Sequence, residues 1–146
     1  MQLMRLTAFS DYSLRVLIYL AAVPDGRSTI AEIAGAFAVS EHHLVKVVQL
    51  LGREGILRNT RGRGGGVQLA LPAEQINVGK VLRLTERGDL PAECFDRATN
   101  ACVLAGGCGL QRILEEAVEK FYAVLGQYSV ADLRASPRKL ALLLQR

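Results

Sequence analysis

The chain has three cysteines, and all of them fall within one short stretch near residue 100. They are Cys94, Cys102 and Cys108, spaced C-x7-C-x5-C, with glycines around the last of them. Thiolates this close in sequence can converge on one metal centre, and an odd number cannot all be used in intrachain disulfides. Structural zinc sites usually show paired C-x2-C spacings, which are absent, whereas iron–sulfur clusters accept looser spacing. The pattern indicates a thiolate metal centre, and it leaves open three ordinary thiols or a redox pair with a spare.

Length and composition indicate a small protein that can accept an anionic partner. The 146 residues suffice for one domain, or for a small domain with an attached oligomerisation arm. Half of the residues are hydrophobic and the formal charge is +4, so the distribution of charge matters more than its sum. We find neither a signal peptide nor an apolar run of the ~18 residues that a membrane span needs. We therefore expect no membrane contact and a reducing cytoplasm as the location.

Residues 8–53 show the pattern of three helices. Thr7 is the predicted N-cap of a first helix, which ends at the turn residues 24–26 and has an apolar face formed by Leu14, Leu17, Ile18 and Ala21. Ser28 and Thr29 precede a short helix over residues 30–37. Ser40 is the predicted cap of a third helix, whose inward residues are Leu44, Val47, Val48 and Leu51. Two short helices joined by a tight turn form a helix-turn-helix.

A glycine-rich hairpin is predicted directly after the third helix. The strand-like runs 56–60 and 67–71 flank the tip Arg61-Gly62-Arg63-Gly64-Gly65-Gly66. A helix-turn-helix followed by a hairpin is a winged helix. The predicted fold class is therefore mainly α with a small β-hairpin wing.

This arrangement predicts contacts with double-stranded DNA. The N-terminal part of the second helix of a helix-turn-helix enters the major groove, and arginines on a thin hairpin suit a narrow minor groove. Four arginines and one acidic residue lie between positions 53 and 63. The alternative is that these are solvated charges on an ordinary helix and hairpin, but the whole combination favours DNA binding. The predicted DNA-binding residues are Thr29, Ser40, Glu41, His42, His43, Lys46, Arg58, Arg61 and Arg63.

The C-terminal half of the sequence predicts a second function, which is assembly of the chain with another copy of itself. A helix is expected over residues 76–86, followed by the cysteine loop over residues 88–109 and by a long helix. The apolar residues of the long helix recur at helical spacing: Leu110, Ile113, Leu114, Ala117, Val118, Phe121, Val124 and Leu125. Burying so long a stripe favours a homodimer over packing onto the same chain. Residues 129–146 are expected to add one more turn or short helix.

The predicted domains are accordingly 1–87, a winged helix-turn-helix DNA-binding domain; 88–109, a cluster-binding loop; and 110–146, a dimerisation helix and tail.

The combination of these motifs resembles the Rrf2 family of winged-helix regulators, and most closely its nitric-oxide-responsive branch. The residues that carry the resemblance are 6–20 in the first helix, 39–40 and 43–47 in the recognition helix, 61–70 in the wing, and the three cysteines. The resemblance covers nearly the whole chain. It implies a winged-helix homodimer that binds a palindromic operator.

The resemblance also implies an iron–sulfur cluster, 4Fe–4S rather than 2Fe–2S, held by Cys94, Cys102 and Cys108. A fourth, oxygen ligand comes from the first helix of the partner subunit in such proteins, and Asp11 stands at the matching position. Asp11 is then expected to exchange between iron and Arg15 when the cluster is lost, with Glu86 as a second possible partner. The implied function is a repressor that releases operator DNA when nitric oxide attacks the cluster.

Other functions stay open beside this one. The wide gap between Cys94 and Cys102 and the segment 121–130 approach the iron-responsive branch of the family, whereas Asp11 favours the nitric oxide branch. The runner-up is therefore a repressor that senses iron or iron–sulfur status. A non-regulatory iron–sulfur redox protein and a DNA-binding protein without a cofactor are further alternatives. We find no nucleophile–base pair and no phosphate loop ending in GK[ST], so we expect no enzyme activity.

Overall fold

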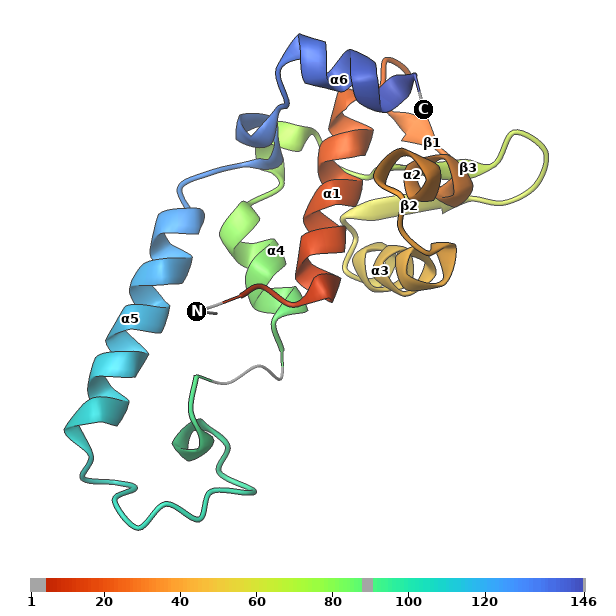
Figure 1. The fold of residues 1–146 in the computed structure, drawn as a ribbon. Helices are drawn as coiled ribbons and strands as arrows, with labels where there is room; N and C mark the ends of the chain where they lie inside the picture. Colours follow the sequence, from red (N-terminus) through yellow and green to blue (C-terminus); the bar gives the residue numbers. More distant parts are fainter. Residues whose placement is uncertain (1–4, 88–90, 146) are drawn as a thin grey trace.

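The N-terminal half of the protein is a helix-turn-helix built around one central helix. The computed structural model describes residues 5–87 and 91–145. Helices α1 (Ala8–Ala22), α2 (Ile30–Phe37) and α3 (Glu41–Arg53) follow one another as predicted. Figure 1 shows α1 between α4 (Val78–Thr85) on one side and the pair α2 and α3 on the other. The N-cap prediction for α1 is confirmed, because the Thr7 side chain accepts a hydrogen bond from the Ser10 amide.

The predicted hairpin forms two strands of a small three-stranded sheet. Strands β2 (Leu57–Thr60) and β3 (Gly66–Leu69) pair antiparallel, with Leu57 opposite Leu69 and Thr60 opposite Gly66. A third strand, β1 (Arg27–Ser28), was not predicted, and it pairs antiparallel with the other edge of β3. A two-residue strand between a turn and a helix cap carries no periodicity of its own, so only its pairing with β3 reveals it.

The buried face of α1 differs from the predicted one. Val16, Leu17, Tyr19 and Leu20 are buried, while the predicted Leu14, Ile18 and Ala21 are only half-buried. The prediction was wrong because it assumed a helix with one core-facing stripe. Helix α1 instead contacts α3, α4, β3 and the 3-10 helix η3 (Val130–Leu133), so several neighbours bury it.

Helix α4 begins later than predicted, because the residues before it pair with the distant C-terminal segment. The 3-10 helix η1 (Ala73–Gln75) comes first, and Ile76 and Asn77 are extended. The Val130 amide donates to the Ile76 carbonyl at 2.9 Å, and the Val78 amide donates to the Tyr128 carbonyl at 3.0 Å. Asn77 then caps α4 by accepting from the Lys80 amide. The segment after α5 is thus fastened to the N-terminal half.

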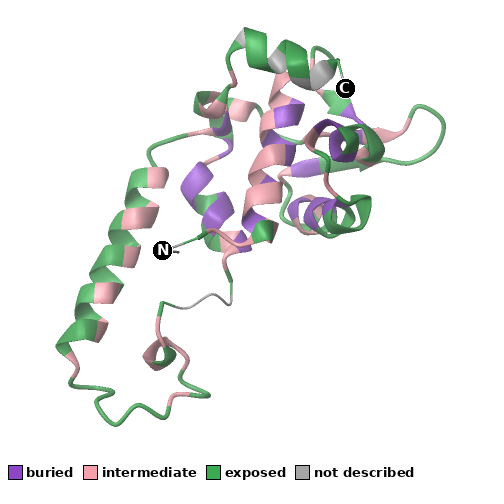
Figure 2. Cartoon of the chain, viewed as in Figure 1, coloured by how far each residue is buried: buried purple, intermediate pink, exposed green. Residues whose placement is uncertain are grey.

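Helix α5 (Gly109–Leu125) has the predicted extent, but its apolar residues divide into two stripes. Figure 2 shows half-buried positions along the side of α5 that faces α4 and exposed positions on the other side. The half-buried stripe includes Leu114, Val118, Phe121 and Leu125, and the exposed stripe includes Leu110, Ile113, Ala117 and Val124. An ion pair between Arg83 of α4 and Glu119, at 2.7 Å, joins the two helices.

The chain ends with η3 and the helix α6 (Pro137–Leu144), which lies against α2. Val130 of η3 is fully buried in the main core. The division into domains 1–87, 88–109 and 110–146 stays a prediction, and its first junction meets residues 88–90, which lie outside the described residues. Across residues 5–87 and 91–145, no helix is long and apolar enough to cross a membrane.

Candidate DNA interface and metal centre

Helix α3 presents a polar stripe directly opposite its buried face. Leu44, Val47, Val48 and Leu51 are buried, and the predicted DNA-binding residues His42 and Lys46 are exposed. Gln49 and Arg53 continue this exposed line at the i, i+4, i+7, i+11 spacing of one helical face. Arg53 belongs to the basic run predicted over residues 53–63, whereas Gln49 was not predicted, although the same helical spacing in the sequence could have found it. The stripe consists of His42, Lys46, Gln49 and Arg53.

The other predicted DNA-binding residues of the helix-turn-helix differ in whether their side chains already make contacts within the chain. His43 lies at the flank of α3 and stacks against Tyr12 of α1, with ring centroids 6.0 Å apart. Ser40 occupies the N-cap position of α3 without making a side-chain cap hydrogen bond, and Glu41 is exposed beside it. Thr29 completes a capping box on α2, in which its hydroxyl accepts from the Glu32 amide at 3.2 Å. The Thr29 side chain is therefore used within the chain to cap α2.

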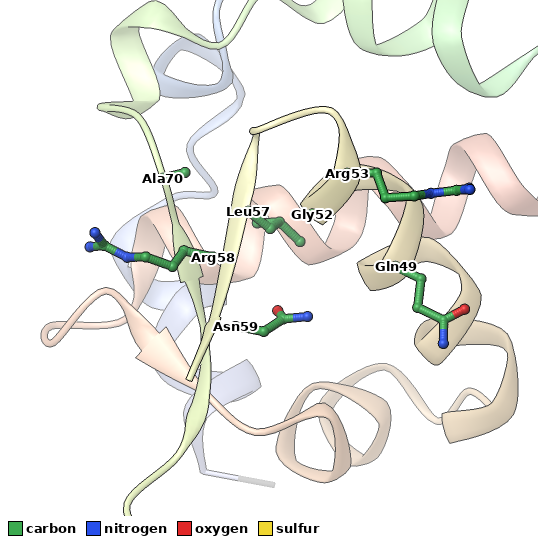
Figure 3. A pocket seen from close by; sticks show the side chains of 7 residues that line it. All are labelled: Gln49, Gly52, Arg53, Leu57, Arg58, Asn59 and Ala70. Atoms are coloured by element: carbon green, nitrogen blue, oxygen red, sulfur yellow. The ribbon is translucent and has the colours of Figure 1, made fainter. Parts of the chain in front are cut away.

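The wing carries its arginines on an exposed turn. Arg58, Arg61 and Arg63 are all exposed, and Gly62 and Gly64 have φ values of +94° and +71°, which favour glycine. A surface groove of about 760 Å³ separates the wing from α3. Figure 3 shows Asn59 pointing from β2 toward α3, while the Arg58 side chain extends on the opposite side of β2 and the Arg53 side chain extends from α3 away from β2. The residues lining the groove are Gln49, Gly52, Arg53, Leu57, Arg58, Asn59 and Ala70.

The cysteine loop lies at the end of α5 far from α6 (Figure 1), and its three thiols are free. Cys94 lies in the 3-10 helix η2 (Glu93–Phe95) and is half-buried, Cys102 is exposed, and Cys108 is the half-buried N-cap residue of α5. Hydrogen bonds within the loop shape it. The Thr99 hydroxyl and the Ala98 amide donate to Asp96 and hold the pKa of its carboxyl below the usual value. The described part of the loop, residues 91–108, contributes no residue to the hydrophobic core.

The donor set of this loop fits an iron–sulfur cluster in its chemistry. Three thiols free of disulfides, on a loop held mainly by its own hydrogen bonds, are the ligands that iron–sulfur clusters use. Among the described residues, however, no three His, Cys, Asp or Glu side chains are close enough together to hold a metal ion. Ligation by all three thiols therefore requires the loop to close around the metal.

The residues proposed for the switch lie at the start of α1 and the end of α4. Asp11 and Arg15 form an ion pair at 2.7 Å, and both side chains are about two-fifths exposed. The two residues therefore pair within α1, and the exchange of Asp11 between iron and Arg15 stays a prediction. Glu86 instead accepts hydrogen bonds from the amide and the hydroxyl of Thr7, at 2.9 and 3.0 Å. Glu86 therefore fixes the beginning of α1 rather than pairing with Arg15.

Comparison with known proteins identifies the family. The family described as Rrf2, iron-dependent transcriptional regulator, matches residues 6–136. The chain belongs to the Rrf2 family. The transcriptional regulator NsrR of Bacillus subtilis is 47% identical over 131 residues, which cover 89% of this chain and 90% of that protein. NsrR of Geobacillus kaustophilus is 45% identical, covering 94% and 96% of the two chains.

Solved structures support the same assignment. CymR of Bacillus subtilis, a global cysteine regulator, superposes with a TM-score of 0.71 at 25% identity, covering 90% of this chain and 96% of CymR. IscR of T. potens has a TM-score of 0.71 at 22% identity and shares the fold. The predicted winged-helix fold and the predicted class of function, a DNA-binding transcriptional repressor, are confirmed.

Proposed function

We propose that this Rrf2 protein is a homodimeric repressor that senses nitric oxide through a 4Fe–4S cluster. The observation that carries the proposal is the presence of three free thiols on one loop, in a chain whose relatives are named NsrR. Cys94, Cys102 and Cys108 would hold the cluster, with Asp11 of the partner subunit as the fourth ligand. When bound, the cluster would supply iron that reacts with nitric oxide. A cytoplasmic location would keep these thiols reduced.

The DNA-binding surface would engage both grooves of a palindromic operator. The exposed stripe of α3 would enter the major groove, and the wing arginines would lie in the adjacent minor groove. A twofold dimer would present two such surfaces to half-sites about 10 base pairs or a multiple of this apart. Ser40 supports this placement, because its hydroxyl makes no cap hydrogen bond and lies exposed at the start of α3.

Helix α1 would couple the cysteine loop to the DNA-binding surface. Asp11 pairs with Arg15 at 2.7 Å, so binding of Asp11 to iron would have to break or share this ion pair. Arg15 also lies over the rings of Tyr12 and Phe37, at 5.9 and 5.8 Å, and Tyr12 stacks on His43 of α3. A change of partner at Asp11 would therefore alter contacts that reach the recognition helix. Regulation requires that this change favour one of the two dimer states.

The second candidate is a repressor that senses iron or iron–sulfur status. The description of the family as iron-dependent favours it. It would use the same thiols and the same DNA-binding surface, and differ only in the signal.

Anaerobic titration of the purified protein with nitric oxide tests the proposal. We expect iron and sulfide in the protein, a visible absorbance that nitric oxide removes, and weaker operator binding afterwards. Asp11→Ala should alter the spectrum or its response, whereas Glu41→Ala, on the DNA side, should leave both unchanged. A cluster that resists stoichiometric nitric oxide but is lost on iron chelation would favour the second candidate. Equal operator affinity with and without the cluster would refute both the nitric oxide sensor and the iron sensor.

A further inference from the structure

Arg27 of β1 lies in a row of polar side chains on the outer face of the small sheet. The register places Arg27 and Arg58 on opposite sides of Gln68, one from each edge strand. The neighbouring row contains Ser28 and Val67, which are buried, so the row of Arg27 faces away from the core. Gln68 can accept from the Arg58 Nε at 2.7 Å once its amide is turned, which occupies Arg58 but not Arg27.

The glycines of the wing leave a path for the Arg27 side chain toward the tip. Gly66 lies two residues before Gln68 on the same face of β3, and Gly64 lies in the turn just before the strand, so a diagonal neighbour in β1 can lie across Gly66 toward Gly64. A Cβ at Gly66 would lie 3.3 Å from both Cγ and Nε of Arg27, and one at Gly64 would lie 3.5 Å from its terminal nitrogen. The side chain therefore extends along the hairpin, with its guanidinium beside the wing turn. Gly66 leaves room for Arg27 and for the Ser28 carbonyl, whose oxygen would lie 2.9 Å from a Cβ there. Gly64 also serves the turn through its positive φ.

This position adds a third positive charge to the two at the tip. Arg61 and Arg63 flank Gly62, and all three arginines are exposed. The ion pairs found within residues 5–87 and 91–145 involve Arg15, Arg83, Lys120 and Arg134, and none of the three wing arginines. Clustered like charges without carboxylate partners are unfavourable in the free protein and are relieved by a polyanion.

We propose that Arg27 binds a DNA phosphate at the rim of the minor groove that receives Arg61 and Arg63. Arg27 comes from the neighbouring strand β1, and its guanidinium lies against Gly64 at the side of the wing turn, so it would meet the backbone bordering the groove rather than the base edges. This proposal rests on the DNA binding proposed above. It is independent of the cluster and of the nitric oxide response.

A phosphate contact by Arg27 and a groove contact by Arg61 or Arg63 would affect DNA binding in different, measurable ways. A phosphate contact carries no sequence information, but each one contributes about 0.9 to the slope of log affinity against log salt concentration. Arginines inside the groove sense its width, so they favour narrow, A-tract minor grooves. Loss of Arg27 should lower the salt slope equally on all sequences, whereas loss of a tip arginine should reduce discrimination between sequences.

The experiment measures fluorescence anisotropy of two duplexes of equal length, one containing A-tracts and one rich in G·C, over a salt series with the full-length, anaerobically prepared protein. We expect Arg27→Ala to lower the slope by about 1 per subunit, about 2 for a dimer, on both duplexes. Arg27→Lys should restore most of the slope, because it keeps the charge. Arg61→Ala and Arg63→Ala should weaken the preference for the A-tract duplex.

Arg134→Gln is the matched control, because it removes one exposed arginine that pairs with Glu74 where η1 contacts η3, outside the wing. It should leave the slope unchanged. An unchanged slope for Arg27→Ala, while Arg61→Ala or Arg63→Ala lowers binding, would overturn the role of Arg27 and leave DNA binding intact. Failure of the unsubstituted protein to bind either duplex would overturn both the role of Arg27 and the proposed DNA binding.

Discussion

The Ser10 hydroxyl is buried between α1 and α4, 2.6 Å from the hydroxyl of Thr85. We expect Ser10→Ala to lower the free energy of unfolding by about 1 kcal/mol, because it removes a buried neutral hydrogen bond. The loss stays moderate because Thr85 keeps its bond to the Val81 carbonyl at 3.1 Å. Urea unfolding at one fixed protein concentration measures the change. Ser40→Ala is the control, since the Ser40 hydroxyl caps nothing, and an equal effect of both substitutions would contradict the assignment.

Glu32 gives the stability of the protein a dependence on pH. The Thr29 amide and the Ser28 hydroxyl both donate to its carboxylate at 2.7 Å and hold its pKa below the ordinary value of 4.5. Because the folded pKa is the lower one, the carboxylate stabilises the fold above 4.5, and this contribution is lost as the pH falls through the folded value. Glu32→Gln should therefore lose less stability on acidification than the unsubstituted protein. Urea midpoints across this range test it, with Glu54→Gln at an exposed position as the control.

Residue contacts were predictable from the sequence only where they are local. The cap of Thr7 on Ser10 and the ion pair of Asp11 with Arg15 follow from helical spacing, which the sequence displays directly. The bonds from Thr7 to Glu86 join positions 79 residues apart, and no pattern in the sequence indicates them. The same holds for Arg27 beside the wing glycines.

At the scale of elements, Gly79 determines how closely α4 and α5 meet. A Cβ at this position would lie 2.7 Å from the Gly126 nitrogen and 2.9 Å from the Tyr122 carbonyl oxygen, both backbone atoms that cannot easily yield. We expect Gly79→Ala to lower the free energy of unfolding by about 1–3 kcal/mol, as overpacking does. Gly35→Ala in α2 is the control, because nothing lies within 4 Å of its Cβ and alanine favours the helix. Thermal or urea unfolding of both variants checks the contrast, and a neutral Gly79→Ala would contradict it.

Elements with their own periodicity or caps were predicted well, and elements defined by distant partners were not. The inward residues of α3 were all identified, because a helix at the surface displays one apolar stripe. Strand β1 was missed, and the face of α1 was wrong, because each depends on neighbours far away in the sequence. The start of α4 was displaced for the same reason, since Ile76 pairs with Val130.

At the scale of the whole molecule, the sequence indicates which residues are the candidate metal ligands, but it does not indicate their geometry. Residue type and spacing single out the three cysteines, and the structure shows all three thiols free on one loop. Within the described chain, Cys94, Cys102 and Cys108 do not gather into a site. The proposed ligand from a partner subunit and the proposed closure of the loop would both depend on residues or a metal outside the single chain.

The exposed stripe of α5 provides the test of that assembly. Leu110, Ile113 and Val124 are 61%, 56% and 54% exposed, on the side of the helix adjacent to the stripe that packs against α4. Pairing with a second copy would bury them, so Ile113→Glu, which would place a charge from each subunit in the interface, should weaken dimerisation by at least about tenfold. Sedimentation equilibrium measures the dimer constant, and circular dichroism checks that the helices remain.

Glu115→Lys changes charge by a larger amount on the opposite face of the same helix, so it should leave the dimer constant unchanged. If Ile113→Glu dimerises like the unsubstituted protein, α5 is not the interface. The stripe would then need another cover, and the proposed approach of the partner's Asp11 to the cysteine loop would lose its structural basis. If dimerisation weakens and cluster retention falls with it, while Glu115→Lys retains both, the metal centre is shared between subunits.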